Sequence, residues 1–415
     1  MCRHDQRPKE RTIWKRTPCN FANVDKAEAN DHSMVRTSFY GSQTMPGIID
    51  ADTHIAESES MWKYFDEELY QRRPVMVAAP DDTLYRDFNV LWLIDGKIFP
   101  KASGRGGFRI ITPTASKRES RRTDIALGCR EITDVAARLA DMDKAGVETQ
   151  VIYPTLFLID VTEDAKLQAA LCGAYNKFLG EVYRKSNHRL RWVAVLPLKS
   201  LNESITQMHD AKQNGAVGIF FSGIVGSLTL NNPHFDPIYA EAEKLGLPIC
   251  IHTGQSCRHL LDFFDLELNG TFATSHVPPI VGFRDLVASE IPEKFPDLKF
   301  GFLEVSASWV PFLYHHLKRS ARPRPSFPNA RWKHASCKDL FRDYRIYVAC
   351  EVDEDIPYLA QFIGDDHLLI GSDYGHNDPA EEKALVQTLQ GRADLSTSQV
   401  EKILCHNPKE FYGLN

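Results

Sequence analysis

Residues 48–57 read Ile48-Ile49-Asp50-Ala51-Asp52-Thr53-His54-Ile55-Ala56-Glu57, and the fold can be worked out from this stretch. An apolar strand ends there in an Asp-x-His pair. Alternate side chains of a strand share a face, so Asp52 and His54 project together, about 6.6 Å apart along the strand. Zinc binds carboxylate and imidazole at about 2.0–2.2 Å, so one cation could join them. No glycine-rich nucleotide turn follows the strand, which argues against a doubly wound, dinucleotide-binding sheet.

Composition narrows the class of protein. The chain has 415 residues, 43% hydrophobic and 25% charged, enough for one large core or two domains. A net charge of −6 with mixed signs argues against a nucleic-acid partner, and no apolar run reaches the 18 or so residues of a membrane span. Nine scattered cysteines without a Cys-x-x-Cys pair predict reduced thiols. With no apolar segment after the basic N-terminal residues, we expect a cytoplasmic protein.

The chain divides into an extension and a long alternating region. Residues 1–45 are polar and aperiodic, which predicts a disordered or loosely attached segment; a natural start at Met45 is the alternative. Residues 46–415 alternate short apolar runs with amphipathic stretches, the pattern of βα units. The predicted strands are Ile48–Ile55, Glu148–Tyr153, Trp192–Pro197, Val217–Phe221, Pro248–His252, Lys299–Glu304, Arg345–Ala349 and Leu368–Ser372. The predicted helices include Ile132–Ala145, Asp164–Lys185, Leu201–Asn214, Pro237–Lys244, Ser308–Arg319 and Ile356–Phe362.

Eight strands with intervening helices predict an α/β fold, a distorted (β/α)₈ barrel. The region 58–129 is too long for a simple connection and reads as an insertion after the first strand. In such a barrel it would leave from the C-terminal rim, where active sites lie. We therefore expect it to cap the site.

Metal-compatible side chains recur where other predicted strands end. The fifth strand ends at His252 and the eighth is followed by Asp373. Each alone has a structural alternative, since a strand-end histidine can bond to the next loop and an aspartate can cap a helix. Strand ends converge in a barrel, however, so Asp52, His54, His252 and Asp373 together predict one metal site. Two imidazoles and two carboxylates suit zinc, manganese or iron.

Several segments resemble the amidohydrolase-2 family, which includes aminocarboxymuconate-semialdehyde decarboxylase and the aromatic-acid decarboxylases. They are Asp-Ala-Asp-Thr-His-Ile-Ala-Glu from Asp50, Val-Ile-Tyr-Pro-Thr from Val151, Leu-Pro-Ile-Cys-Ile-His-Thr-Gly from Leu247 and Gly-Ser-Asp-Tyr-Gly-His from Gly371. The resemblance runs collinearly from about residue 46 to 415. It implies a distorted TIM barrel with one divalent metal, zinc or alternatively manganese, held by Asp52, His54, His252 and Asp373.

Two positions depart from the family pattern. The first-strand pair is Asp-x-His, where many relatives carry His-x-His or Glu-x-His. Glu304 ends the sixth strand, where well-studied decarboxylases place an acid/base histidine. We therefore regard Glu304 as a catalytic candidate of different chemistry. The fourth strand, from Val217 to Ser222, ends without the lysine that binuclear relatives need for a carbamate bridge, which favours a single metal.

Further residues are candidates for substrate contact or proton transfer. Arg258 could bind a substrate carboxylate bidentately, or could be a surface arginine. His276 could face the pocket or cap the next helix, and Glu57 could hold a ligand or substrate or lie in a solvated loop. His376, three residues after Asp373, is the better candidate for proton transfer.

Two enzymatic functions fit this pattern. The first is a metal-dependent, cofactor-free decarboxylase of an aromatic or unsaturated carboxylic acid, with Asp373 or His376 delivering a proton. The alternative is a hydrolase of a cyclic amide, lactone or C–C bond that uses metal-activated water. A third hypothesis, a binding module with a decayed site, predicts no metal and no activity. We expect a small-molecule substrate and a homo-oligomer, with no nucleic-acid or membrane partner.

Overall fold

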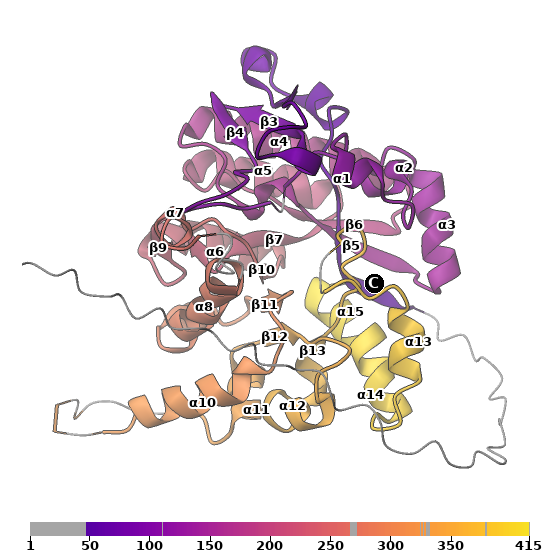
Figure 1. The fold of residues 1–415 in the computed structure, drawn as a ribbon. Helices are drawn as coiled ribbons and strands as arrows, with labels where there is room; N and C mark the ends of the chain where they lie inside the picture. Colours follow the sequence, from indigo (N-terminus) through magenta and orange to yellow (C-terminus); the bar gives the residue numbers. More distant parts are fainter. Residues whose placement is uncertain are drawn as a thin grey trace, which may run out of the picture. The chain divides into compact units, whose positions relative to one another are not determined.

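The computed structural model describes residues 47–109, 111–265, 272–323, 325–326, 328, 333–377 and 380–414. The predicted extension, residues 1–45, lies outside the described residues. Eight parallel strands form one sheet, and Figure 1 shows them in the centre of the drawing with helices around them. In sheet order these are β1 (Ile49–His54), β5 (Thr149–Tyr153), β6 (Leu190–Ala194), β7 (Ala216–Ser222), β10 (Ile249–His252), β11 (Phe300–Leu303), β12 (Ile346–Ala349) and β13 (Leu368–Leu369).

Helices connect successive strands, as in a (β/α)₈ barrel, which confirms the predicted fold. They are α3 (Val135–Ala145), α4 (Ala165–Lys185), α5 (Leu201–Gln213), α6 (Asp236–Leu245), α8 (Val277–Val287), α10 (Trp309–Ser320), α11 (Cys337–Asp343) and α12 (Ile356–Ile363), followed after β13 by α13 (Leu385–Gln390), α14 (Thr397–Glu401) and α15 (Asn407–Tyr412). Asp164 begins α4 by accepting backbone hydrogen bonds from Lys166 and Leu167. Gly146 ends α3 in the left-handed conformation, with φ 75°.

The barrel closes between β1 and the segment after β13. Ala51 N donates to Ile370 O (3.2 Å) and Asp373 N donates to Asp52 O (3.1 Å). Gly371 allows this approach, because a Cβ at that position would lie 2.3 Å from Asp52 Cβ. The prediction of a regular strand over residues 368–372 was wrong in extent, since only Leu368–Leu369 is regular. The remaining residues bend to contact β1, where Ser372 donates hydrogen bonds to Asp50.

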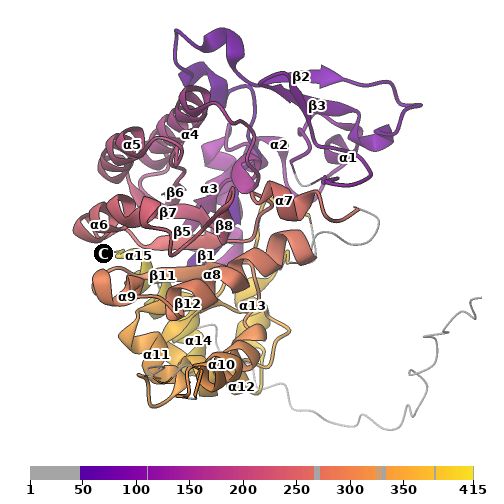
Figure 2. The ribbon, with the colours of Figure 1, turned by 90° about the vertical axis from the view of Figure 1, so that its left-hand side faces the viewer.

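The insertion forms a small subdomain built on a three-stranded antiparallel sheet of β2 (Val75–Ala78), β3 (Val90–Ile94) and β4 (Lys97–Phe99). Two short helices, α1 (Lys117–Ser120) and α2 (Leu127–Arg130), complete it. In Figure 2 it is the indigo segment at the top, with α7 (Arg258–Leu261) on its lower side. Gly106 N donates to Phe264 O (3.0 Å), which attaches it to the loop after β10. Its role as a cap stays a prediction.

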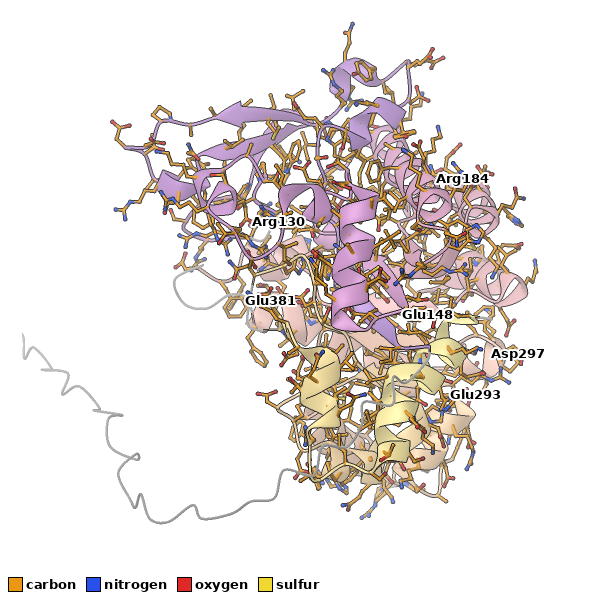
Figure 3. All side chains as sticks on the ribbon, turned by 90° about the vertical axis from the view of Figure 1, so that its right-hand side faces the viewer. Arg130, Glu148, Arg184, Glu293, Asp297 and Glu381 are labelled. Atoms are coloured by element: carbon orange, nitrogen blue, oxygen red, sulfur yellow. The ribbon has the colours of Figure 1, made fainter. Side chains whose placement is uncertain are left out.

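The end of the insertion is anchored by a buried arginine. Arg130, labelled beside α3 in Figure 3, donates to Glu119 Oε2 (2.9 Å) and to Glu119 O (3.1 Å). Only 3% of its side chain is exposed, so these bonds are made away from water. Charge-assisted hydrogen bonds of this kind are stronger than neutral ones, and they fix the chain where it re-enters the barrel.

Candidate active site

The end of β1 separates two aspartates by a β-bulge. The register with β5 shifts between Asp50 and Thr53, so one extra residue lies on β1. Asp50 accepts bonds from Ser372 N (2.8 Å) and Ser372 Oγ (2.5 Å), whereas Asp52 and His54 face the barrel mouth together. The bulge therefore directs two of the three acidic and imidazole side chains of this strand toward one point.

Both histidines at the mouth present Nε2 to this point. His54 Nδ1 lies 3.0 Å from Pro154 O, and His252 Nδ1 lies 2.9 Å from Thr253 O. A carbonyl oxygen only accepts, so each Nδ1 carries the proton and donates it. In the neutral ring each Nε2 is then left with a lone pair, the form in which imidazole binds metal. The backbone carbonyls thus fix the tautomer that a metal site requires.

Carboxylates surround these two nitrogens. His252 Nε2 lies 3.2 Å from both Asp52 Oδ2 and Glu304 Oε2. His54 Nε2 lies 3.5 Å from Asp52 Oδ1, 3.4 Å from Glu304 Oε2 and 3.5 Å from Asp373 Oδ1. The donor atoms of Asp52, His54, His252 and Glu304 all lie within 4.8 Å of one another. Sequence reasoning placed Glu304 at this strand end as a catalytic group; the geometry also places it among the potential metal donors.

These donors fit a divalent cation. Four atoms of this donor set are buried and form no hydrogen bond with the described part of the chain: Asp52 Oδ1, His54 Nε2, His252 Nε2 and Glu304 Oε2. Buried polar atoms without partners are rare and costly, and here they point at one another. A cation at their centre would satisfy all four, and nitrogen with carboxylate oxygen is a zinc- or manganese-type donor set.

The pKa directions show how strongly these groups interact. Burial lowers the pKa of His54 well below its usual 6.5, so its ring is neutral. Burial acts in the same direction on His252, but Asp52 and Glu304 outweigh it and raise that pKa well above 6.5. Burial acts to raise the pKa of Glu304, yet His252 and His54 hold it well below 4.5. The carboxylates therefore favour positive charge at this point.

Asp373 and His376 form a second group against the first. Asp373 Oδ1 lies 2.8 Å from His376 Nδ1, and the His376 ring stacks on His54 with centroids 3.6 Å apart. His376 Nε2 lies 2.8 Å from Thr155 Oγ1. Both nitrogens of His376 thus have partners that hold the ring beside the potential metal donors. Such an oriented carboxylate–imidazole pair can move a proton at the barrel mouth.

Glu57 supports this group from beneath. Its two carboxylate oxygens accept backbone bonds from Thr155 N (3.0 Å) and Leu156 N (2.8 Å). The side chain is buried, and burial raises its pKa to about 7, with the two backbone bonds acting in the opposite direction. Glu57 therefore holds the loop that carries Thr155. Its predicted contact with substrate stays a prediction.

Two of the site's carboxylates stand on strained backbone. Glu304 has φ 51° and Asp373 has φ 53°, both in the left-handed region that non-glycine residues seldom adopt. Each such residue costs on the order of 1–3 kcal/mol and persists where the surroundings impose it. Here the strain turns both carboxylates toward the histidines.

Two predicted substrate residues lie outside this cluster. Arg258 begins α7 on the rim, where its side chain is 57% exposed and pairs with Asp262 at 2.9 Å. His276 ends the π-helix Phe272–His276 that leads into α8, and its Nδ1 is buried without a hydrogen bond to a described residue. Neither contacts the potential metal donors in the described structure. Their roles stay predictions.

Two arginines that support the site were not predicted from the sequence. Arg122, from the insertion, donates to Gly375 O (2.9 Å) and His376 O (2.7 Å) and so holds the loop of Asp373 and His376. Arg138, fully buried on α3, donates to His54 O (3.4 Å) and lies 3.9 Å over the Tyr374 ring. Neither has a distinctive neighbourhood in the sequence, since both contacts join segments more than 80 residues apart. Only the fold reveals them.

The family of the chain follows from comparison with known proteins. The family model described as Amidohydrolase matches residues 49–414, nearly all of the described chain. The chain therefore belongs to the amidohydrolase family, as its sequence segments predicted. It is an enzyme of that superfamily, a metal-dependent carboxy-lyase or hydrolase that acts on a small molecule.

Individual relatives are distant. A 2-amino-3-carboxymuconate-6-semialdehyde decarboxylase of Dictyostelium discoideum is 20% identical over 291 residues, 68% of this chain and 77% of its own. Among solved structures, an amidohydrolase from Mycobacterium avium subsp. paratuberculosis has a TM-score of 0.68 at 19% identity, covering 89% of this chain and 98% of its own. A 5-carboxyvanillate decarboxylase from Novosphingobium aromaticivorans, complexed with manganese and a nitrobenzoic acid, has a TM-score of 0.64 at 18% identity, covering 92% and 100%. The structural likenesses support the barrel fold.

Among the described residues, no helix combines the length and apolar character needed to cross a bilayer.

Proposed function

We propose that the protein is a metal-dependent decarboxylase that removes carbon dioxide from an aromatic or unsaturated carboxylic acid. The observation that carries the proposal is a buried metal-type donor set with the Asp373–His376 ion pair of 2.8 Å beside it. Two distant relatives, named above as decarboxylases of carboxylic acids, support the same chemistry.

Asp52, His54, His252 and Glu304 would hold the cation, with Asp373 at the edge of the set. Asp373 Oδ1 lies 3.5 Å from His54 Nε2 and 2.8 Å from His376 Nδ1, so one oxygen of this carboxylate faces both the donor set and His376, and Oδ2 would be left for the second of these roles. A zinc ion, or alternatively manganese, would act as a Lewis acid on the substrate carboxylate and a neighbouring oxygen. The β7 strand ends at Ser222 without a lysine, which favours a single ion.

The chain's own groups would carry the proton. Asp373, which forms an ion pair with His376, would receive a proton from the His376 imidazolium and deliver it to the ring carbon that bears the carboxylate. That carbon becomes tetrahedral, its bond to the carboxylate breaks, and the electron pair returns to the ring as carbon dioxide leaves. Thr155 and Arg122 hold His376 in place from two sides during this transfer.

Hydrolysis is the second candidate, favoured by one observation. Asp373 lies beside the donor set as a carboxylate that could take a proton from a water molecule and pass it to a leaving group. The substrate would then be a cyclic amide, a lactone or a compound with a cleavable C–C bond. Both reactions use the same residues, so the products must decide between them.

The test is a product analysis in labelled water. Protein loaded with zinc or manganese is incubated with hydroxybenzoates and unsaturated dicarboxylic acids, and carbon dioxide and oxygen-18 incorporation are measured by mass spectrometry. Carbon dioxide release without oxygen-18 in the organic product supports decarboxylation. Oxygen-18 uptake, or no carbon dioxide from any acid, overturns it. The Asp373→Asn variant serves as the matched control for contaminating activity.

A further inference from the structure

We propose that a cavity beside the candidate active site binds an apolar arm of the substrate, an inference that rests on the proposed decarboxylase function. The cavity has a volume of about 500 Å³. Its walls come from the segments that follow β5, β6, β7 and β10 and from the first half of α4. It therefore opens along the rim on which the potential metal donors lie.

Three of the residues that line the cavity connect it to the site. Phe220 lines it, and the Phe220 ring lies 6.0 Å from the His252 ring, centroid to centroid. Ser222 also lines it and is the register partner of His252 across β7 and β10. On the other side, Phe157 follows Thr155, the hydrogen-bond partner of His376, by two residues. Phe220 and Ser222 therefore form a wall that the cavity shares with the strand end carrying His252.

The cavity surface is largely apolar. Phe157, Leu171, Phe220, Val225 and Leu228 supply aromatic and aliphatic surface. Several polar side chains in its wall already have partners within the protein: Lys199 with Asp160 (2.5 Å), Gln168 with Lys199 N (3.1 Å), His234 with Leu198 O (2.9 Å) and Ser256 with Ile224 O (2.5 Å). Because these groups are satisfied, the occupant gains most by burying hydrocarbon rather than by hydrogen bonding.

The size argues for more than a single ring. A cavity of about 150 Å³ is enough for benzene. A space of about 500 Å³ leaves room for an alkyl chain or a second ring beyond the acid-bearing one. Arg258 and His259, both exposed, also line the cavity, so a long arm could reach solvent beside them. The substrate class we infer is an aromatic or unsaturated acid with an apolar substituent of several carbons.

The test measures binding without turnover. Metal-loaded protein is titrated by calorimetry with benzoate and with its 3- and 4-alkyl derivatives of two, four and six carbons. In at least one series, we expect the Kd to fall about fourfold per added methylene until the cavity is filled. If the affinity of the wild-type protein does not rise with the length of the alkyl chain, or if it binds none of these acids, the inference is overturned.

A variant that fills the cavity tests whether the gain in affinity with chain length arises there. Val225 and Ile224 are neighbours on the short strand β8 (Ile224–Val225) and are both half-buried, but only Val225 lines the cavity. Val225→Trp should remove the dependence on chain length, whereas Ile224→Trp should retain it. Leu228→Trp, on the paired strand β9 (Leu228–Thr229), provides a second filled variant should Val225→Trp fail the circular-dichroism check of folding. Unchanged dependence in a folded filled variant contradicts the assignment.

This result is separable from the proposed function. Chain-length dependence with no carbon dioxide from any acid would retain the arm site and reject decarboxylation. Carbon dioxide release from hydroxybenzoates, with a Kd that does not depend on chain length, would support decarboxylation and reject the arm site.

Discussion

Replacing Arg122 by methionine tests whether the insertion positions the catalytic loop. The guanidinium donates one hydrogen bond each to Gly375 O and His376 O and a bidentate pair to Asp124 of the insertion, and only 6% of the side chain is exposed. Methionine has a similar length but no donor. The substitution therefore leaves two carbonyl oxygens of the loop without their partner, releases Asp124 within the insertion, and removes little packing.

The expected size follows from the two bonds to the loop. Hydrogen bonds to a charged group contribute about 1.5–3 kcal/mol each, and part of this returns when water reaches the carbonyls, so we expect about 3 kcal/mol less stability for the loop. Displacing a catalytic group by about 1 Å costs about 100-fold in rate. We therefore expect kcat to fall about 100-fold. Metal content should stay unchanged, because Arg122 bonds to none of the four donors.

Three measurements check this. Steady-state decarboxylation gives kcat, elemental analysis gives the metal content, and amide hydrogen exchange of a peptide covering residues 373–377 gives the loop stability without any substrate. Arg121→Met is the matched control, because Arg121 is adjacent, 65% exposed and paired with Asp87 within the insertion. Full turnover together with unchanged exchange in Arg122→Met would refute the positioning role.

Three shorter predictions concern the site itself. His252→Ala should lower bound metal well below one equivalent, and a full equivalent by elemental analysis would contradict its assignment. Asp373→Asn should lower turnover by about 10²–10⁴-fold while retaining fold and metal, so undiminished activity would exclude it from proton transfer. Burial raises the pKa of Glu57 to about 7, so the unfolded chain loses this proton first as the pH rises. The wild-type free energy of unfolding should therefore fall by about 2 kcal/mol relative to Glu57→Gln between pH 5 and pH 7, measured by urea denaturation; parallel curves would contradict the shift.

The barrel and the main cluster could be predicted because they depend on local patterns. Strand–helix alternation indicates the order of the elements, and the rule that parallel strands end at one rim brings Asp52, His54, His252 and Asp373 together. The structure places all four within one buried cluster. No such rule gives a side chain's direction at a strained backbone, so the inward turn of Glu304 at φ 51° could not be read from its position.

The supporting contacts could not be predicted for a different reason. Arg122 and Gly375 are 253 residues apart, and nothing in either neighbourhood specifies the other. The bulge in β1 is also invisible in the sequence, where Asp50, Asp52 and His54 look like one alternating face. The register shift is what leaves Asp50 to bind Ser372 and frees the other two for the site.

The charges of the site argue for a metal independently of family membership. Three carboxylates, from Asp52, Glu304 and Asp373, converge on His54 and His252 with 8% or less of each side chain exposed. Carboxylates removed from water require a compensating cation. The fully buried Arg138 does not supply it, because its guanidinium bonds to backbone oxygens and Gln150 behind β1. One proton on His252 would offset a single charge, whereas a divalent ion offsets two and also fills the coordination of both Nε2 atoms. The fold brings buried carboxylates and two imidazole Nε2 atoms to one point. A divalent ion is the simplest group that would both neutralise the carboxylates and accept the imidazole lone pairs.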